Sequence, residues 1–228
     1  MILFNGREQC EKMKIKGAIF DLDGTLLDSM WVWEQVDMDF LGSRGFDVPE
    51  DYQKAIAAMG FRETAEYTIK RFGLNERAED VIQEWNDMAQ RMYHERVTIK
   101  PYVRETLEAF REKGIGLGVA TASYASLFEK CLRRNGIYEY FHAFTETKEV
   151  RRGKGFPDIY IRAAEKIGCA PQECVVFEDI HPAILAARAG GFFTVAVYDG
   201  KSEHAWEDMK RDAHLAIRGF ADLFLDEY

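Results

Sequence analysis

Two aspartates separated by one residue follow a short apolar run near the start of the chain. Asp21 and Asp23 come directly after the run 15–20, within the segment DLDGT. Carboxylates this close repel one another, and a hard divalent cation with oxygen ligands offsets the repulsion, with Mg²⁺ favoured where phosphate also binds. An exposed turn is the alternative interpretation, because Asp-Gly is a common turn dipeptide.

Polar side chains also follow two later apolar runs. Thr121 ends one of them, and the pair Glu178 and Asp179 ends the other. Between these runs, Lys154 lies just before a predicted helix that Pro157 is suited to open. A lysine there can neutralise a bound phosphate, whereas a lone lysine is more often a solvated surface charge. Together these residues predict a site that combines carboxylates, a hydroxyl and an ammonium group.

The runs that carry these residues have the character of buried strands. Apolar segments at 15–20, 115–120, 174–177 and 192–197 alternate with segments of helical spacing at 103–113, 124–135, 158–167 and 181–189. This alternation predicts an α/β fold, a Rossmann-like, doubly wound parallel sheet with helices on both faces. The carboxyl ends of such strands form the edge at which ligands bind.

Glycines mark the expected ends of these helices. We expect left-handed C-terminal caps at Gly114, Gly136, Gly168 and Gly190. From residue 202 to the end of the chain we expect a short helix, a strand at 213–217 and a closing helix, none of them with a chemical role.

The segment from about Met30 to Val97 interrupts the alternation. It has apolar residues at helical spacing, turn residues at 42–49 and 73–75, and no run typical of a strand. We therefore assign 14–29 and 98–228 to a catalytic core, 30–97 to an inserted all-helical cap domain, and 1–13 to an N-terminal extension. Because the insertion leaves the core at the ligand-binding edge, we expect it to act as a lid.

Composition and charge argue against several classes of function. The 228 residues carry a formal net charge of -9 with no basic stripe, which opposes binding to nucleic acid. No stretch approaches the ~18 consecutive apolar residues of a membrane span, and the first residues lack the features of a secretion signal. Four cysteines at scattered spacings are typical of free thiols in a reducing compartment. We expect a cytoplasmic monomer that binds neither nucleic acid nor membranes.

Taken in order, the segment DLDGT, Thr121, Lys154 and the acidic pair resemble the four signatures of the haloacid dehalogenase (HAD) superfamily. The resemblance runs from about Lys14 to the C-terminal region, and the insertion resembles that superfamily's small helical cap. It implies that Asp21 is a nucleophile that forms an aspartyl-phosphate, and that Asp23 is the general acid and base. Dehalogenases and phosphonatases of the superfamily usually lack an Asp at the position of Asp23, so phosphate ester chemistry is favoured.

The resemblance also implies how metal and phosphate are held. The ligands of Mg²⁺ would be the Asp21 carboxylate, the Asp23 backbone carbonyl, Asp179, and Glu178 either directly or through water. The non-bridging phosphate oxygens would bind Thr121, the backbone amide of Ala122 and Lys154.

Hydrolysis of a small phosphorylated metabolite, a sugar or polyol phosphate, is the favoured activity. The main alternative is a phosphosugar mutase, because the cap, the pair Asp28 and Ser29, and the stretch from Lys154 to Asp158 also resemble β-phosphoglucomutases. Those mutases generally carry a His ten residues after the second Asp, where this chain has Trp33, and indole cannot shuttle protons. A phosphatase of macromolecules and a non-catalytic binding module are further alternatives.

Three residues of the insertion are candidates for the substrate pocket: Trp31, Trp33 and Arg62. Arg62 follows Gly60 near the place where the mutases carry an Arg that grips a distal phosphate, although the spacing is imperfect. Packing in the core of the insertion is the alternative for the aromatic residues, since aromatics at helical spacing are usually core.

Overall fold

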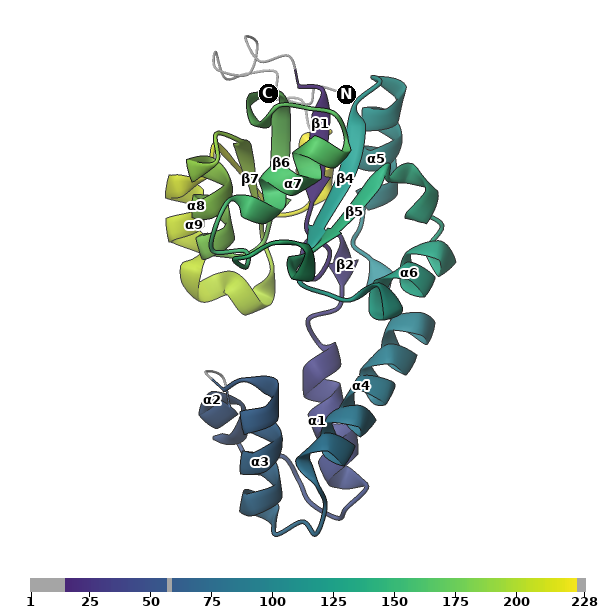
Figure 1. Ribbon diagram of the computed structural model, residues 1–228, viewed down its shortest axis with the longest axis vertical. Helices are drawn as coiled ribbons and strands as arrows, with labels where there is room; N and C mark the ends of the chain where they lie inside the picture. Colours follow the sequence, from purple (N-terminus) through teal and green to yellow (C-terminus); the bar gives the residue numbers. More distant parts are fainter. Residues whose placement is uncertain (1–14, 57–58, 225–228) are drawn as a thin grey trace. The chain divides into compact units, whose positions relative to one another are not determined.

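The computed structural model describes residues 15–56 and 59–224, which fall into two compact units (Figure 1). The first unit contains the described residues up to Met30 and those from Val97 onward, and the second contains Trp31–Arg96. The N-terminal extension expected at 1–13 lies outside the described residues.

A six-stranded parallel sheet forms the centre of the first unit. The strand order is β5-β4-β1-β6-β7-β8. β1 therefore lies in the middle, with strands added later in the chain on both of its sides, which is the arrangement that opens a crevice at the carboxyl ends of the strands. The predicted fold class is confirmed. The strands are β1 (Gly17–Phe20), β4 (Gly116–Thr121), β5 (Ala143–Glu146), β6 (Cys174–Glu178), β7 (Phe193–Val197) and β8 (Leu215–Ile217).

Helices cover both faces of this sheet (Figure 1). Successive strand residues point to opposite faces, so Ile19 packs in a buried cluster with residues of α7 and α8, whereas the Phe20 ring contacts Phe110 of α5. Both faces of β1 are buried, which is why its residues form a continuous apolar run. The helices are α5 (Val103–Glu112), α6 (Ala125–Arg134), α7 (Asp158–Lys166), α8 (His181–Ala189) and α9 (Trp206–Asp212).

Several local features differ from the sequence-based expectations. Strand β5 was not predicted, because three of its four residues are only half-buried and its sequence lacks a clear apolar pattern. Gly190 has a φ of -75° and the left-handed residue is Gly191, so the expected cap is one residue out of place. Gly190 is instead required by close packing, since a β-carbon there would lie 2.9 Å from Pro157 Cβ. The closing helix is a four-residue 3-10 turn, Phe220–Leu223.

The two connections to the helical unit run side by side. Strands β2 (Leu27–Asp28) and β3 (Thr98–Ile99) pair in an antiparallel ribbon, with Leu27 opposite Ile99. Lys100 N also donates to Leu26 O over 2.8 Å. The chain thus leaves and re-enters the first unit through one hydrogen-bonded ribbon.

The described residues of the second unit form four helices. In α4, Val81, Trp85, Met88 and Met92 recur at helical spacing and are buried. The Trp85 ring packs edge to face against Phe40 of α1, with 5.4 Å between centroids. Within 15–56 and 59–224, no helix has the length and apolar character that a membrane span requires. The helices are α1 (Val32–Gly42), α2 (Tyr52–Ile56), α3 (Phe61–Phe72) and α4 (Ala78–Glu95).

Candidate active site

The loop after β1 makes a tight turn at the carboxyl edge of the sheet. Asp21 continues the pairing with β6, because its N–H donates to Phe177 O over 3.1 Å. The chain then reverses, and Leu27 N donates to Leu22 O over 2.7 Å. Gly24 adopts a φ of 82°, a conformation that suits glycine because it has no β-carbon. The turn keeps Asp21 and Asp23 at the end of the strand.

Three buried carboxylates converge at this edge. Asp21, Glu178 and Asp179 each offer an oxygen within 4.8 Å of the others, and their exposed fractions are 4%, 0% and 2%. In the part of the chain that the structure describes, no hydrogen-bond donor reaches Oε2 of Glu178 or Oδ2 of Asp179. Buried carboxylate oxygens are normally hydrogen-bonded, so two without a donor call for another positive partner.

Lys154 is the cation of this cluster. Its ammonium group donates to Asp21 Oδ1 and, over 2.6 Å, to Glu178 Oε1. The side chain is only 10% exposed. Lys154 is therefore a buried ion-pair partner of Asp21, which follows β1, and of Glu178, which ends β6. The interpretation of Lys154 as a solvated surface charge is wrong.

One ammonium group does not neutralise three carboxylates. Burial raises the pKa of Asp21 well above its usual range, and Glu178 and Asp179 raise it further, while the Lys154 charge opposes them. Burial and Glu178 raise the pKa of Asp179 to about 7. The metal-free cluster therefore retains protons near neutral pH, which a divalent cation would displace.

The donor set fits a hard divalent cation. Three carboxylates supply oxygen ligands, and two of their oxygens are buried without a donor in the described part of the chain. Mg²⁺ and Ca²⁺ prefer such oxygen ligands, whereas structural zinc sites are built from Cys and His. The geometry thus agrees with a hard divalent cation at Asp21, Glu178 and Asp179.

Asp23 occupies a different environment. It is half-buried, and its two carboxylate oxygens accept hydrogen bonds from Ser29 Oγ, over 2.7 Å, and from Ser123 Oγ. Thr121 is fully buried at the end of β4, and its Oγ1 accepts from Ser123 N over 3.0 Å. The exposed Ala122 follows. The end of β4 thus places the Thr121 hydroxyl beside Ser123, whose own hydroxyl holds Asp23.

Sequence reasoning missed several members of this site. The Tyr160 hydroxyl in α7 donates a hydrogen bond of 2.7 Å to Glu178 Oε1. Thr25 Oγ1 donates to Asp179 Oδ1 over 3.3 Å. Ser29 and Ser123 hold Asp23. Proximity to the DLDGT segment and to Thr121 was a usable signal for the serines, whereas Tyr160 resembles an ordinary core residue of an amphipathic helix.

Comparison with known proteins decides the family. Residues 15–191 match the haloacid dehalogenase-like hydrolases. The chain belongs to this family. The resemblance expected from the four sequence motifs is confirmed, and the acidic cluster, Lys154 and Thr121 of this HAD protein lie together at one edge of its sheet.

Relatives of this HAD protein include phosphatases and a mutase. It is 27% identical over 193 residues to a phosphorylated carbohydrates phosphatase of Thermotoga maritima, covering 82% of this chain and 89% of the relative. It is 27% identical to a β-phosphoglucomutase of Bacillus subtilis, with 93% of both chains covered. The solved structure of a candidate β-phosphoglucomutase from Thermotoga maritima superposes with a TM-score of 0.80 at 26% identity, covering 92% of this chain and 97% of the other.

The three candidate pocket residues of this HAD protein all lie in the helical unit. The Trp33 side chain is partly exposed and packs edge to face on Phe61, with 5.4 Å between centroids. Arg96 stacks over the Trp31 ring at 4.8 Å. The Arg62 guanidinium is exposed and pairs with Glu79 over 2.8 Å. Arg62 thus has a carboxylate partner within the helical unit itself.

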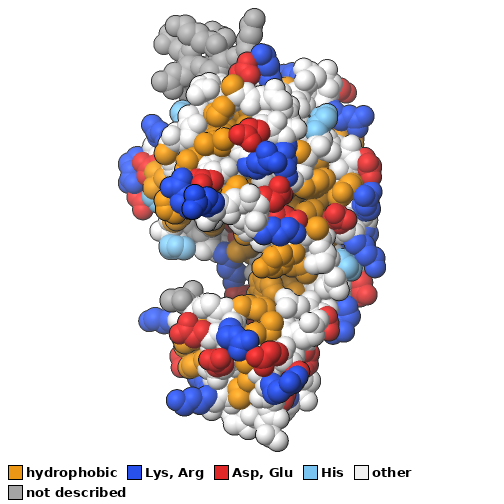
Figure 2. All heavy atoms as spheres, viewed as in Figure 1, with side chains coloured by type: hydrophobic (Ala, Val, Ile, Leu, Met, Phe, Trp, Pro, Cys, Tyr) orange, Lys and Arg blue, Asp and Glu red, His pale blue; other side chains and the backbone are white. Residues whose placement is uncertain are grey.

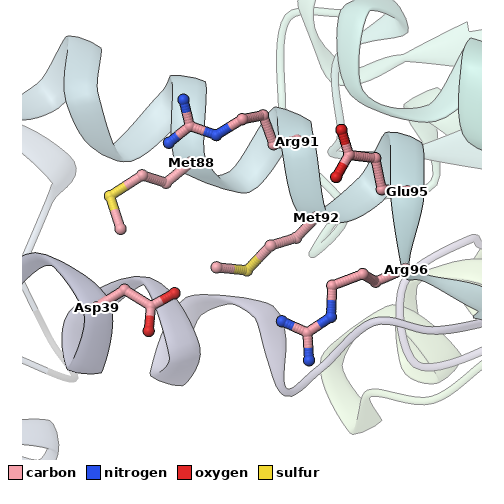
Figure 3. Close-up of a pocket in the computed structure, with 6 residues that line it drawn as sticks. All are labelled: Asp39, Met88, Arg91, Met92, Glu95 and Arg96. Atoms are coloured by element: carbon pink, nitrogen blue, oxygen red, sulfur yellow. The ribbon is translucent and has the colours of Figure 1, made fainter.

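Figure 3 shows a separate pocket within the helical unit. It has a volume of about 190 Å³ and lies between α1 and α4. Its walls combine two acidic groups, two arginines and two methionine side chains, contributed by Asp39, Met88, Arg91, Met92, Glu95 and Arg96. None of these residues belongs to the four HAD motifs, so we assign this pocket no chemical role.

Charge on the face of the HAD protein shown in Figure 2 is mixed. Lys and Arg side chains lie among Asp and Glu side chains over both units in that view. Nucleic-acid-binding proteins typically gather basic residues on one face or along one helix. The face in view therefore has no such footprint.

Proposed function

We propose that the chain is a Mg²⁺-dependent phosphatase that hydrolyses small phosphate monoesters, sugar or polyol phosphates, through an aspartyl-phosphate on Asp21. The observation that carries the proposal is the buried cluster of Asp21, Glu178 and Asp179, in which two oxygens lack a donor among the described residues beside a single lysine. Relatives named as phosphatases of phosphorylated carbohydrates and of hexitols support the class of substrate.

The first half of the reaction transfers the phosphoryl group to the protein. An Asp21 carboxylate oxygen attacks phosphorus, and the bond between phosphorus and the ester oxygen breaks. The leaving oxygen takes the proton of Asp23, which two serine hydroxyls hold in place. The alcohol departs, and Asp21 carries the phosphoryl group.

The second half returns the protein to its starting state. Asp23, now ionised, removes a proton from a water molecule, which attacks the phosphorus of the aspartyl-phosphate. The bond between phosphorus and the Asp21 oxygen breaks, and inorganic phosphate leaves. Asp23 ends protonated and Asp21 ends as a carboxylate, so the cycle balances.

Other groups hold the phosphoryl oxygens during transfer. In this proposal the Thr121 hydroxyl, the Ala122 amide and the Lys154 ammonium donate to them. When bound by Asp21, the Asp23 carbonyl, Glu178 and Asp179, Mg²⁺ would supply positive charge at the nucleophile and the phosphate. Lys154 would then exchange part of its contact with Asp21 for contact with phosphate.

We further propose that the two units divide the work. The sheet-containing unit is the catalytic core, and the helical unit of residues 31–96 is a cap that selects small substrates. Trp31, Trp33 and Arg62 are the residues of the cap that we propose to contact the substrate.

A phosphosugar mutase is the second candidate. The match to a β-phosphoglucomutase over 93% of both chains favours it. Trp33 counts against it, because this chain has an indole, which cannot shuttle protons, where those mutases generally carry a His that helps couple general acid-base action to cap closure.

The experiment is a phosphate-release assay on sugar, polyol and nucleotide phosphates, with Mg²⁺ or with a chelator, using wild type and Asp21→Asn. We expect release that requires Mg²⁺ and that Asp21→Asn abolishes. A parallel assay on β-glucose 1-phosphate, coupled to detection of glucose 6-phosphate, tests the mutase. Isomerisation without phosphate release would replace the phosphatase with the mutase.

A further inference from the structure

Lys100 makes an unusual set of contacts close to the acidic cluster. Its ammonium group donates to the backbone oxygen of Gly24, to Tyr198 O over 3.2 Å and to Asp199 Oδ2 over 2.8 Å. The side chains of Lys100 and Asp199 are 15% and 11% exposed. All three donors of this buried ammonium group are therefore used within the protein.

The backbone that carries Lys100 is itself held in place. Lys100 N donates to Leu26 O, and the preceding residues pair with β2. On the other side, the Asn135 side chain donates to Val97 O over 3.1 Å and accepts from Ile99 N over 3.3 Å. Lys100 thus extends from a segment fixed between the nucleophile loop and the end of α6.

The carbonyl that accepts from Lys100 belongs to Gly24, a residue closely packed in the site. Gly24 packs against the Asp179 carboxyl group, and a β-carbon on Gly24 would lie 2.9 Å from Asp179 Cγ. The neighbouring Thr25 hydroxyl donates to Asp179 Oδ1. A contact that fixes Gly24 therefore also fixes the distance between the nucleophile loop and Asp179.

Asp199, another partner of Lys100, belongs to a different loop. Asp199 follows β7, the strand beside β6, and Asp179 follows β6. Asp199 Oδ1 accepts from Lys201 N over 3.0 Å, so this carboxylate is oriented independently of Lys100. One ammonium group thus joins the loop after β1 to the loop after β7, with Asp179 between them in the strand order.

We propose that Lys100 is a positioning residue that holds the DLDGT loop against Asp179 and so determines the affinity of the acidic cluster for Mg²⁺. The inference rests on the proposed function, since it takes Mg²⁺ as the ion. In this proposal Lys100 acts through Gly24 and Asp199, its hydrogen-bond partners, and is not itself a ligand of the ion. Groups one step removed from a metal commonly change its affinity about 10- to 100-fold when they are lost.

Loss of the Lys100 charge and loss of its contact with Gly24 should change the Mg²⁺ affinity in opposite directions, which makes the proposal testable. Removal of a positive charge near a cation site strengthens cation binding, whereas loss of the tie to Gly24 weakens it. Lys100→Met alone combines both effects and leaves Asp199 without its ammonium partner. The double variant Lys100→Met with Asp199→Asn removes one charge of each sign and isolates the positional effect.

The experiment measures Mg²⁺ binding to the metal-free protein by titration calorimetry, together with thermal unfolding in chelator and turnover of the best substrate. Controls are Lys16→Met and its double with Glu173→Gln, because that pair joins residues of the same unit at the surface. We expect the Lys100 and Asp199 double variant to bind Mg²⁺ at least about tenfold more weakly, with kcat reduced and KM little changed, while the controls match wild type.

Two results would overturn the inference. Unchanged Mg²⁺ affinity in a folded double variant would show that the tie to Gly24 has no effect on the cluster. Tighter binding in both Lys100 variants would show that only the charge matters. Wild type that binds no Mg²⁺ would refute the proposed cofactor itself, and wild type that binds Mg²⁺ yet releases no phosphate would refute the proposed reaction, so the failures are distinguishable.

Discussion

Gly24 lies directly against the carboxyl group of Asp179, and a β-carbon at Gly24 would lie 2.9 Å from Asp179 Cγ. Gly24 also has a φ of 82°. Two independent constraints, the backbone conformation and the contact with the acidic cluster, therefore require glycine at this position of the DLDGT segment.

Gly24→Ala should weaken both folding and the metal site. The left-handed conformation alone costs a residue with a β-carbon about 1–2 kcal/mol, and the contact with Asp179 adds to this. We expect Mg²⁺-dependent phosphate release to fall more than about tenfold. Urea denaturation and the phosphate assay measure the two effects.

Gly114→Ala is the matched control. Gly114 lies in the same unit with a φ of 71°, and no contact from elsewhere in the described chain lies within 4 Å of the position that a β-carbon would take there. It should lose about 1 kcal/mol of stability and keep its activity. Equal activity loss in the two variants would show that strain, and not contact with Asp179, explains the result.

Lys154→Met should lower the stability of the fold more in the absence of metal than in its presence. The substitution leaves Asp21 and Glu178 without their buried ammonium partner, and breaking a buried pair costs about 3–5 kcal/mol. Mg²⁺ should restore part of this stability by taking over the charge of the carboxylates. Phosphate release should still fall at least about 100-fold, since the group that we propose to stabilise the transferred phosphoryl is gone.

The measurement is thermal unfolding of wild type and Lys154→Met in chelator and in Mg²⁺. Lys148→Met serves as control, because Lys148 belongs to the same connection and its side chain is 61% exposed. A Lys154→Met variant that unfolds like wild type in chelator would contradict the structural role of the ion pair.

Tyr160→Phe tests the hydroxyl that supports Glu178. The substitution removes the 2.7 Å hydrogen bond to Glu178 Oε1 and keeps the ring that packs on Phe192. Burial and the Glu178 charge raise the pKa of Tyr160 well above its usual range, so the hydroxyl remains a donor through the working pH range. We expect a loss of about 2 kcal/mol in the free energy of unfolding.

Tyr140→Phe is the control for this prediction. Tyr140 also donates to a glutamate, Glu108, over 2.8 Å, but at the surface. Its loss should change stability by less than about 0.5 kcal/mol. Similar destabilisation by both substitutions would mean that burial of the Glu178 bond is irrelevant.

How far the sequence predicts this site depends on the range of the contacts. Asp21, Thr121 and Asp179 were recognisable because each ends an apolar run, and parallel strands bring their carboxyl ends to one edge. Tyr160 and Lys100 were not, because their partners lie 18 and 76 residues away and nothing local marks the contact. Such hydrogen bonds follow from the packing of the whole unit.

The strands likewise differ in how readily the sequence predicts them. Strands β1, β4, β6 and β7 are fully or almost fully buried and stand out as apolar runs. Strand β5 has three half-buried residues out of four at the edge of the sheet, so its pattern is indistinct. Edge strands lack a neighbour on one side, and their residues are correspondingly less apolar.

Asp37→Asn should make the stability of the helical unit less dependent on pH. Asp37 in α1 is 8% exposed and accepts a hydrogen bond from Gln53 Nε2 over 2.7 Å. Burial raises its pKa to about 6. The folded protein therefore holds this proton more tightly than the unfolded chain, and stability is lost as the pH rises from about 4 through 6.

The size of this effect follows from the pKa difference and is on the order of 3 kcal/mol above pH 7. Asn accepts the same hydrogen bond without a charge, so Asp37→Asn should be more stable than wild type at pH 7 and nearly equal to it at pH 4. Urea denaturation from pH 4 to 8 measures this, with Asp39→Asn, an exposed position on the same helix, as control. Parallel pH profiles for wild type and Asp37→Asn would show that Asp37 is ionised without cost, and the burial argument for this carboxyl group would fail.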